Sequence, residues 1–248
     1  RVLFRSIRLL HACETGSRVW GFASADSDYD VRVLYVHPTE WYFSLYERED
    51  AWQQMLDERM IDISAWELRK ALRLLHRSNA AMLERAQSPI IYHEQAGFAA
   101  DFWELAQHCY SRIAVMHHYL SMARGTMHDI QAAGAEGYKL KKLFYLLRCA
   151  CITRWILRFE SVPSIDFHRV LPAAELPQAL LERVHELLAL KANADESYLH
   201  KGDGELLDYA AQMLTQAQDG FKALPAAKVE IERLQAFFNR YAMPDAPL

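Results

Sequence analysis

The chain contains 248 residues, of which 52% are hydrophobic and 12% aromatic, so it has ample apolar material for a buried core and is not a disordered protein. Its formal net charge of −4 argues against an extensive nucleic-acid footprint but allows a local basic patch. No apolar run approaches the ~18 residues of a membrane span, and the four cysteines show neither a Cys-x-x-Cys pair nor a zinc-ligand spacing. We therefore expect a cytoplasmic protein with reduced cysteines, no membrane partner and no disulfide partner.

Residues 1–6 lack an initiator Met and match a translation of the end of a common sequencing adapter. We interpret them as an assembly scar on an N-terminally truncated gene, with native sequence starting near Ile7. On this interpretation, a helix or strand upstream of Ile7 has been lost.

Strands and one helix are expected in the first third of the chain. The predicted elements are strands at residues 7–13, 31–36 and 60–64 and an amphipathic helix at residues 66–77. Ser64, followed three residues later by Glu67, predicts a capping box at the start of that helix. Ser78 and Asn79 are expected to end it, with Asn79 a candidate C-cap or nucleotide contact.

From about residue 97 the strand signal fades and helical patterns take over. The predicted helices occupy residues 98–133 (one or two helices), 138–159, 176–192, 206–223 and 229–241. This change predicts an α+β chain, with a small mixed-sheet head over residues 7–95 followed by an α-helical bundle over residues 96–248.

The motif with the clearest chemical meaning lies between the first two predicted strands. The turn Gly16-Ser17-Arg18 is followed after nine residues by Asp28 and Asp30. Alternate residues of a strand point to the same face, so these two carboxylates can converge on one point. Mg²⁺ takes one or two carboxylates together with substrate phosphates, and two-metal sites use such a pair for in-line displacement.

A third acid, Asp62, lies within the apolar strand predicted at residues 60–64. A buried acid needs a partner, and a ligated metal is one; the alternative is an edge-strand acid facing solvent. A calcium loop of the EF-hand type is excluded. That pattern, started at Asp26, has Val31 in place of the required glycine and His37 in place of the required glutamate.

Basic residues near the acids are candidate phosphate contacts. Arg18 and Arg32 flank the two acids in the sequence, and a surface or structural ion pair is the alternative for each. Arg69 and Lys70 begin the helix that follows Asp62, and one of the two is expected to face the site.

A second basic group lies on the long helix predicted at residues 138–159. Lys141, Tyr145 and Arg148 are spaced i, i+4 and i+7, which places them on one helix face. A basic stripe with a tyrosine suits an NTP or an acceptor strand, and a solvated face of an amphipathic helix is the alternative.

These motifs resemble the DNA polymerase beta-like nucleotidyltransferase superfamily, which combines Gly-Ser, Asp-x-Asp and a third acid on a later strand. The chain is most similar to the RNA repair pathway polymerase-beta-like family of predicted nucleotidyltransferases. The matching segments are ETGSRVWGFAS (14–24), SDYDVR (27–32), DISAWELRKAL (62–72), SPIIY (88–92), HHYLSMA (117–123) and KKLFYLLR (141–148). Ala65 and Glu67 depart from the Gly and Asp expected there, and neither touches the proposed chemistry.

The resemblance implies metal-dependent transfer of a nucleoside monophosphate from an NTP to an acceptor hydroxyl, with release of pyrophosphate. Asp28 and Asp30 would bind two Mg²⁺ ions, for which Mn²⁺ is a substitute, and Asp62 would complete the site of the ion that activates the acceptor. Gly16 and Ser17 would hold the β- and γ-phosphates. The implied nucleotide-binding set is Gly16, Ser17, Arg18, Arg32, Lys70, Lys141, Tyr145 and Arg148.

The acceptor implied by the family is an RNA end. Transfer to a protein or to a small molecule is the second possibility, which the acidic net charge mildly favours over long nucleic acid. A nucleotide-binding regulatory pseudoenzyme is the third, against which the presence of all three acids argues.

Overall fold

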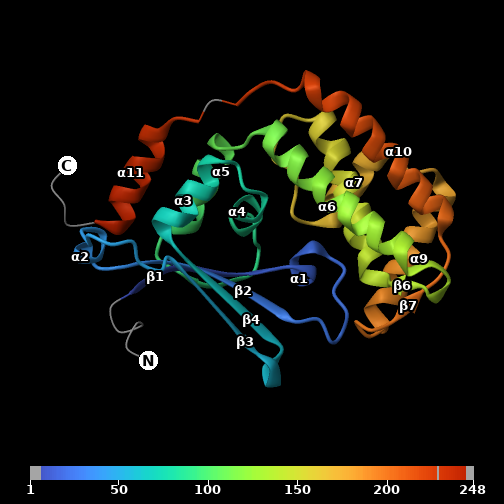
Figure 1. Ribbon diagram of the computed structural model, residues 1–248, viewed down its shortest axis with the longest axis horizontal. Coiled ribbons are helices and arrows are strands. Elements are labelled where there is room, and N and C mark those ends of the chain that lie inside the picture. The colour runs from blue at the N-terminus through green and yellow to red at the C-terminus, as the bar shows by residue number, and fades with distance from the viewer. Residues whose placement is uncertain (1–6, 228, 244–248) are drawn as a thin grey trace. The chain divides into compact units, whose positions relative to one another are not determined.

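The computed structural model describes residues 7–243 except residue 228, and these form two compact units (Figure 1). Within the described residues, the sheet unit comprises 7–16, 28–110 and 227–243, and the helical unit comprises 17–27 and 111–226. Residues 1–6, which we interpret as an assembly scar, lie outside the described residues.

A five-stranded mixed sheet forms the centre of the sheet unit. Its strands are β1 (Arg8–Thr15), β2 (Tyr29–Val36), β3 (Ala51–Leu56), β4 (Ile61–Glu67) and β5 (Ile91–Glu94). The spatial order is β3-β4-β2-β1-β5, with β2 and β4 parallel and every other pair antiparallel. The central strands β1 and β2 are rich in apolar and β-branched residues, which suits their position inside the sheet.

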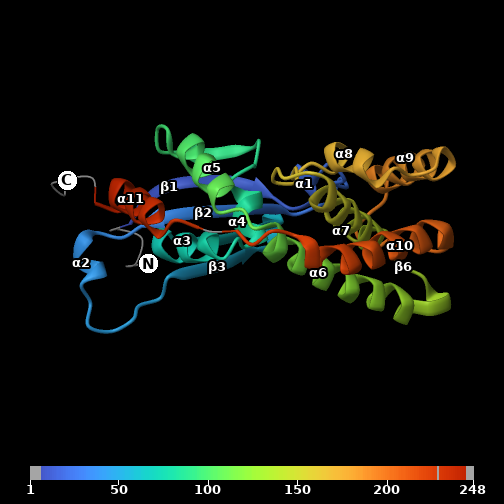
Figure 2. The same ribbon diagram turned by 90° about the horizontal axis from the view of Figure 1, so that it is seen from above.

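The helices of the sheet unit are α2 (Thr39–Tyr42), α3 (Leu68–His76), α4 (Ala80–Arg85), α5 (Phe98–His108) and α11 (Ile231–Ala242). Helices α3, α4 and α5 lie over the same face of this sheet (Figures 1 and 2). Leu68 and Leu75 of α3 are fully buried, and Phe98 of α5 stacks on His11 of β1 with ring centroids 5.8 Å apart. Helix α11 packs against α3 on its outer side.

Helix α7 is the core of the helical unit. The helices of this unit are α1 (Ser17–Trp20), α6 (Arg112–Ala133), α7 (Leu140–Arg158), α8 (Phe167–Val170), α9 (Gln178–Asn193) and α10 (Gly204–Gly220), with a small ladder of β6 (Tyr138–Lys139) and β7 (Leu199–His200). Helices α6 and α10 pack against α7, whose Phe144 and Leu146 are fully buried.

The α+β architecture with a mixed sheet is confirmed, but the start of α3 differs from the prediction. Strand β4 continues to Glu67, because residues 64–66 pair with both β2 and β3. The predicted capping box is therefore wrong, and Glu67 itself caps α3 by accepting the Arg69 N–H at 2.8 Å. Ser78 and Asn79 end α3 as predicted, because Ser78 has a φ of +53° and the Asn79 N–H bonds to the Leu74 carbonyl oxygen at 3.1 Å. The Asn79 side chain also caps the start of α4 by accepting the Met82 N–H at 3.2 Å.

The four cysteines (Cys13, Cys109, Cys149 and Cys151) are buried free thiols. Among the residues that the structure describes, no helix is both long and apolar enough to cross a membrane.

Candidate active site

Two of the predicted acids lie directly opposite each other in the sheet. Strands β2 and β4 are parallel, and their register pairs Asp30 with Asp62. Directly opposed residues share a face, so the two carboxylates project to the same side. The Arg32 guanidinium joins them, because its Nη2 lies 2.5 Å from Asp30 Oδ1 and 2.9 Å from Asp62 Oδ2. The structure thus brings one carboxylate from each of two strands into contact with the same guanidinium group.

Arg32 is held in this position by the sheet itself. Two residues beyond Asp30 on β2, it projects to the same face and donates from Nη1 to the Asp62 carbonyl oxygen at 3.0 Å. Gln53 of β3 adds a longer contact of 3.4 Å from Nε2 to Asp62 Oδ1. In this structure Arg32 forms an ion pair with the acids, which is the alternative to the phosphate contact predicted for it.

The surroundings of Asp30 disfavour its negative charge. Burial raises the pKa of Asp30 to about 6; the Arg32 charge opposes this rise, and the nearby carboxylates of Glu14, Asp62 and Asp28 reinforce it. A carboxylate in such a place is stabilised by an additional cation, as at a metal site.

Gly16 is required beside Asp30 for two reasons. Its φ of +70° lies in the left-handed region that residues with a Cβ avoid. In addition, a Cβ at this position would lie 1.9 Å from Asp30 Oδ2, well inside any allowed contact. The glycine therefore lets the backbone of the turn approach the carboxylate closely.

Glu14 supports the same carboxylate and was missed by the sequence analysis. It is fully buried near the end of β1 and accepts the Asp30 backbone N–H at 2.6 Å. It also accepts the Tyr92 hydroxyl of β5. Glu14 is a positioning residue, and the signal for it was an acid within an apolar strand just before the glycine turn.

Asp28 and Lys70 lie in the sheet unit but differ in their relation to the acid pair. Asp28 is exposed and immediately precedes β2, where its charge acts on Asp30. Lys70 is near the start of α3, beyond the opposite end of β4 from Asp62, and pairs with Asp50 at 2.7 Å. The structure therefore separates Lys70 from the acids.

Five of the predicted nucleotide-binding residues belong to the helical unit; they are Ser17, Arg18, Lys141, Tyr145 and Arg148. Ser17 begins α1, and Arg18 donates from Nη2 to the Ser27 carbonyl oxygen at 2.6 Å. Lys141 Nζ lies 2.8 Å from Glu196 Oε2.

Helix α7 places Tyr145 and Arg148 against the same aromatic ring. The Tyr145 ring contacts Trp20 edge-on at a centroid distance of 5.3 Å, and the Arg148 guanidinium lies 4.5 Å from the Trp20 ring. Arg148 is only 2% exposed, so its charge is part of the core of the helical unit rather than of a solvated helix face.

The donor set of the acid pair suits a divalent metal ion. Carboxylate oxygens are the ligands that Mg²⁺ and Mn²⁺ prefer, and the Arg32 guanidinium shows that positive charge is accommodated between Asp30 and Asp62. Within the described part of the chain, no three carboxylate, imidazole or thiol groups are already gathered as a metal site.

A mixed sheet with facing carboxylates next to a glycine turn defines a polymerase beta-like nucleotidyltransferase. The chain belongs to the RlaP family, described as the RNA repair pathway DNA polymerase beta family, whose model matches residues 4–240. It is 34% identical over 225 residues to the uncharacterized protein YcgL of Bacillus subtilis, covering 91% of this chain and 85% of that protein.

A crystal structure of a nucleotidyltransferase-like protein from Exiguobacterium sibiricum is similar over 99% of this chain and 77% of its own. The sequence identity is 11% and the TM-score is 0.31.

Proposed function

We propose that this protein transfers a nucleoside monophosphate from an NTP to an acceptor hydroxyl, with an RNA end as the acceptor. In this reaction the acceptor oxygen forms a bond to the α-phosphorus, the bond from the α-phosphorus to the bridging oxygen breaks, and pyrophosphate leaves. The hydroxyl proton is taken up by a base. Family membership supports the class of reaction, and the description of the family supports RNA.

The observation that carries the proposal is the pairing of Asp30 with Asp62 across β2 and β4 around a single positive charge. A purely structural ion pair has no need of two acids on one face, with a third, Asp28, next to them. The glycine at position 16 also lets the backbone of the turn lie directly beside this carboxylate, and backbone N–H groups of such turns are common phosphate contacts.

Asp28, Asp30 and Asp62 are the residues that would hold Mg²⁺, which supplies charge neutralisation at the phosphates and activation of the acceptor hydroxyl when bound. Asp62 is the candidate base for the hydroxyl proton. Glu14 holds the backbone of Asp30 by accepting its N–H, Gly16 lies against the Asp30 carboxylate, and Arg32 supplies positive charge on the same face. Positioning and charge neutralisation account for most of the catalysis in phosphoryl transfer.

The test is transfer of label from each α-labelled NTP to a pool of RNA ends, with Mg²⁺ or Mn²⁺. We expect Asp30→Asn and Asp62→Asn to lower transfer by roughly 100-fold or more. Asp208→Asn, on the exposed surface of α10, is the control and should keep full activity. A second readout is the melting temperature, which Mg²⁺ should raise in the parent but not in the Asp30→Asn/Asp62→Asn double variant.

If the label appears on a protein or on a small molecule, that molecule replaces RNA as the acceptor. Metal-dependent NTP binding with no transfer to any acceptor would contradict the enzymatic proposal and favour a regulatory role.

A further inference from the structure

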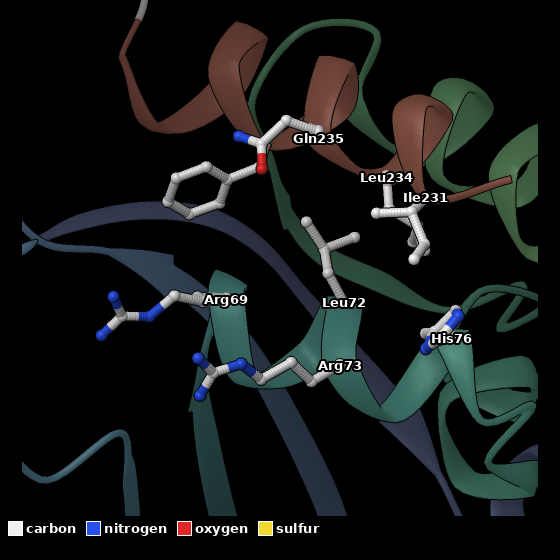
Figure 3. A pocket seen from close by; sticks show the side chains of 8 residues that line it. Arg69, Leu72, Arg73, His76, Ile231, Leu234 and Gln235 are labelled. Carbon is white, nitrogen blue, oxygen red and sulfur yellow. The ribbon is translucent and has the colours of Figure 1, made fainter.

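A groove lies between α3 and α11 in the sheet unit (Figure 3). Its volume is about 310 Å³, and its lining residues are Arg69, Leu72, Arg73, His76, Ile231, Leu234, Gln235 and Phe238. The lining contains two arginines and no acid. Glu67 lies five residue positions after Asp62 on an extended strand, so the groove begins about 17 Å from the acid pair, measured along β4. The groove is therefore distinct from the candidate active site.

One wall of the groove is basic. Arg69 and Arg73 are one helical turn apart on α3 and project to the same side in Figure 3. Arg77 is the C-cap residue one further turn along, beyond the residues that line the groove, so the three arginine positions are separated by a rise of about 6 Å each along the helix axis. Arg73 and Arg77 are exposed, and neither has an ion pair with an acid in the described part of the chain, whereas the charge of Arg69 acts on the Glu67 carboxylate. In a protein of net charge −4, exposed arginines that face no acid indicate an anionic ligand.

The other wall offers aromatic and apolar surface. Phe238 lines the groove from α11 and is half-buried, and its ring packs edge-on against Tyr42 at 5.3 Å. Arg69 already lies over the rings of Tyr42 and Trp41, at 5.3 Å from each centroid. Flat rings beside guanidinium groups provide the two contacts that a nucleotide uses, which are base stacking and phosphate pairing.

We propose that this groove binds single-stranded RNA upstream of the end to be modified, with a base against Phe238 and phosphates along Arg69, Arg73 and Arg77. A strand with several phosphates matches three arginines on successive helical turns better than a single nucleotide does, because the phosphate of one nucleotide cannot contact all three arginines. The proposal rests on the proposed transfer to an RNA end, and the distance of the groove from Asp62 means that only an acceptor several nucleotides long can reach both sites.

The test is binding of a fluorescently labelled single-stranded RNA of about 12 nucleotides, measured by anisotropy without NTP over a range of salt concentrations. Three phosphate contacts predict a slope of roughly −2 in a plot of log K against log salt concentration. Arg73→Glu should weaken binding about tenfold and reduce the steepness of this slope by about 0.7 or more.

Two further variants isolate the aromatic contact and the charge change. Phe238→Leu keeps apolar volume but removes the ring, and we expect binding to fall by roughly 5-fold or more. Arg233→Glu makes the same charge change as Arg73→Glu on the face of α11 that meets Asp101 and Glu104, so it should leave RNA binding within about twofold of the parent.

Equal binding by parent, Arg73→Glu and Phe238→Leu would overturn the proposal, and so would the absence of RNA binding by the parent. Competition by UMP as effective as that of the RNA would assign the groove to a free nucleotide instead. If RNA binds in the groove but the parent transfers no label, the groove stands and the proposed reaction fails. If the parent transfers label but the groove variants leave binding unchanged, the reaction stands and the groove assignment fails.

Discussion

Replacing Gly16 with alanine tests the geometry of the acid pair most directly. Gly16 and Gly97 both lie in the sheet unit and both have positive φ, +70° and +81°. A Cβ at Gly97 meets nothing within 4 Å, whereas a Cβ at Gly16 lies 1.9 Å from Asp30 Oδ2. Gly97→Ala is therefore the matched control, because it has the cost of a left-handed backbone conformation but no steric clash of the new Cβ.

The expected magnitude follows from these two differences. A residue with a Cβ in the left-handed region costs about 1–2 kcal/mol, so Gly97→Ala should lose about that much unfolding free energy. At Gly16 the Asp30 carboxylate must also move by about 1.1 Å, the difference between 1.9 Å and the 3.0 Å that real Cβ contacts respect. That movement breaks the contact with Arg32 and adds about 1.5–3 kcal/mol. The total for Gly16→Ala is about 2.5–5 kcal/mol.

Urea unfolding of the two variants and of the parent measures this difference. Nucleotidyl transfer should fall about 100-fold in Gly16→Ala, because a shift of about 1 Å in a catalytic group is enough for that loss, and should persist in Gly97→Ala. Equal losses of stability in both variants, with activity retained in Gly16→Ala, would refute the inferred approach of Gly16 to the carboxylate.

Two other predictions concern buried or half-buried acids that stabilise each unit, Glu67 in the sheet unit and Glu196 in the helical unit. Glu67→Ala should lower the unfolding free energy by about 2–4 kcal/mol, because Glu67 caps α3 and accepts the Tyr42 hydroxyl at 2.7 Å. Glu67→Gln should lower it by less. An equal loss of unfolding free energy in both variants would contradict the capping role. In the helical unit, burial works to raise the pKa of Glu196, but Lys141, Lys191 and two serine hydroxyls lower it to about 2. Because the ionised form is favoured in the fold, its contribution of up to about 3 kcal/mol is present above pH 4.5 and is lost as pH falls toward 2. The stability difference between parent and Glu196→Gln should shrink over that range, and a difference independent of pH would disprove this account.

Local patterns in the sequence were enough to predict the fold class and to select the acids of the candidate site. Short apolar runs predicted β1, β2 and part of β4, because such a run depends only on neighbouring residues. The strand β3 (Ala51–Leu56) was missed, because its exposed middle, Gln53 to Met55, lacks an apolar run. The end of β4 at Glu67 was also missed, since only pairing to strands on both sides keeps residues 64–66 extended.

The sequence by itself determined that Asp28 and Asp30 lie two residues apart at the start of a strand, because an i, i+2 spacing acts over a few residues; the approach of Gly16 to Asp30 depends on the pairing of β1 with β2. Only the tertiary structure decided that Asp62 lies opposite Asp30, since strand register is set by pairing between distant segments. The same pairing aims Arg32 at both acids rather than leaving it free, and it makes the buried Glu14 a partner of Asp30. The groove between α3 and α11 likewise depends on tertiary packing, because its two walls come from opposite ends of the chain.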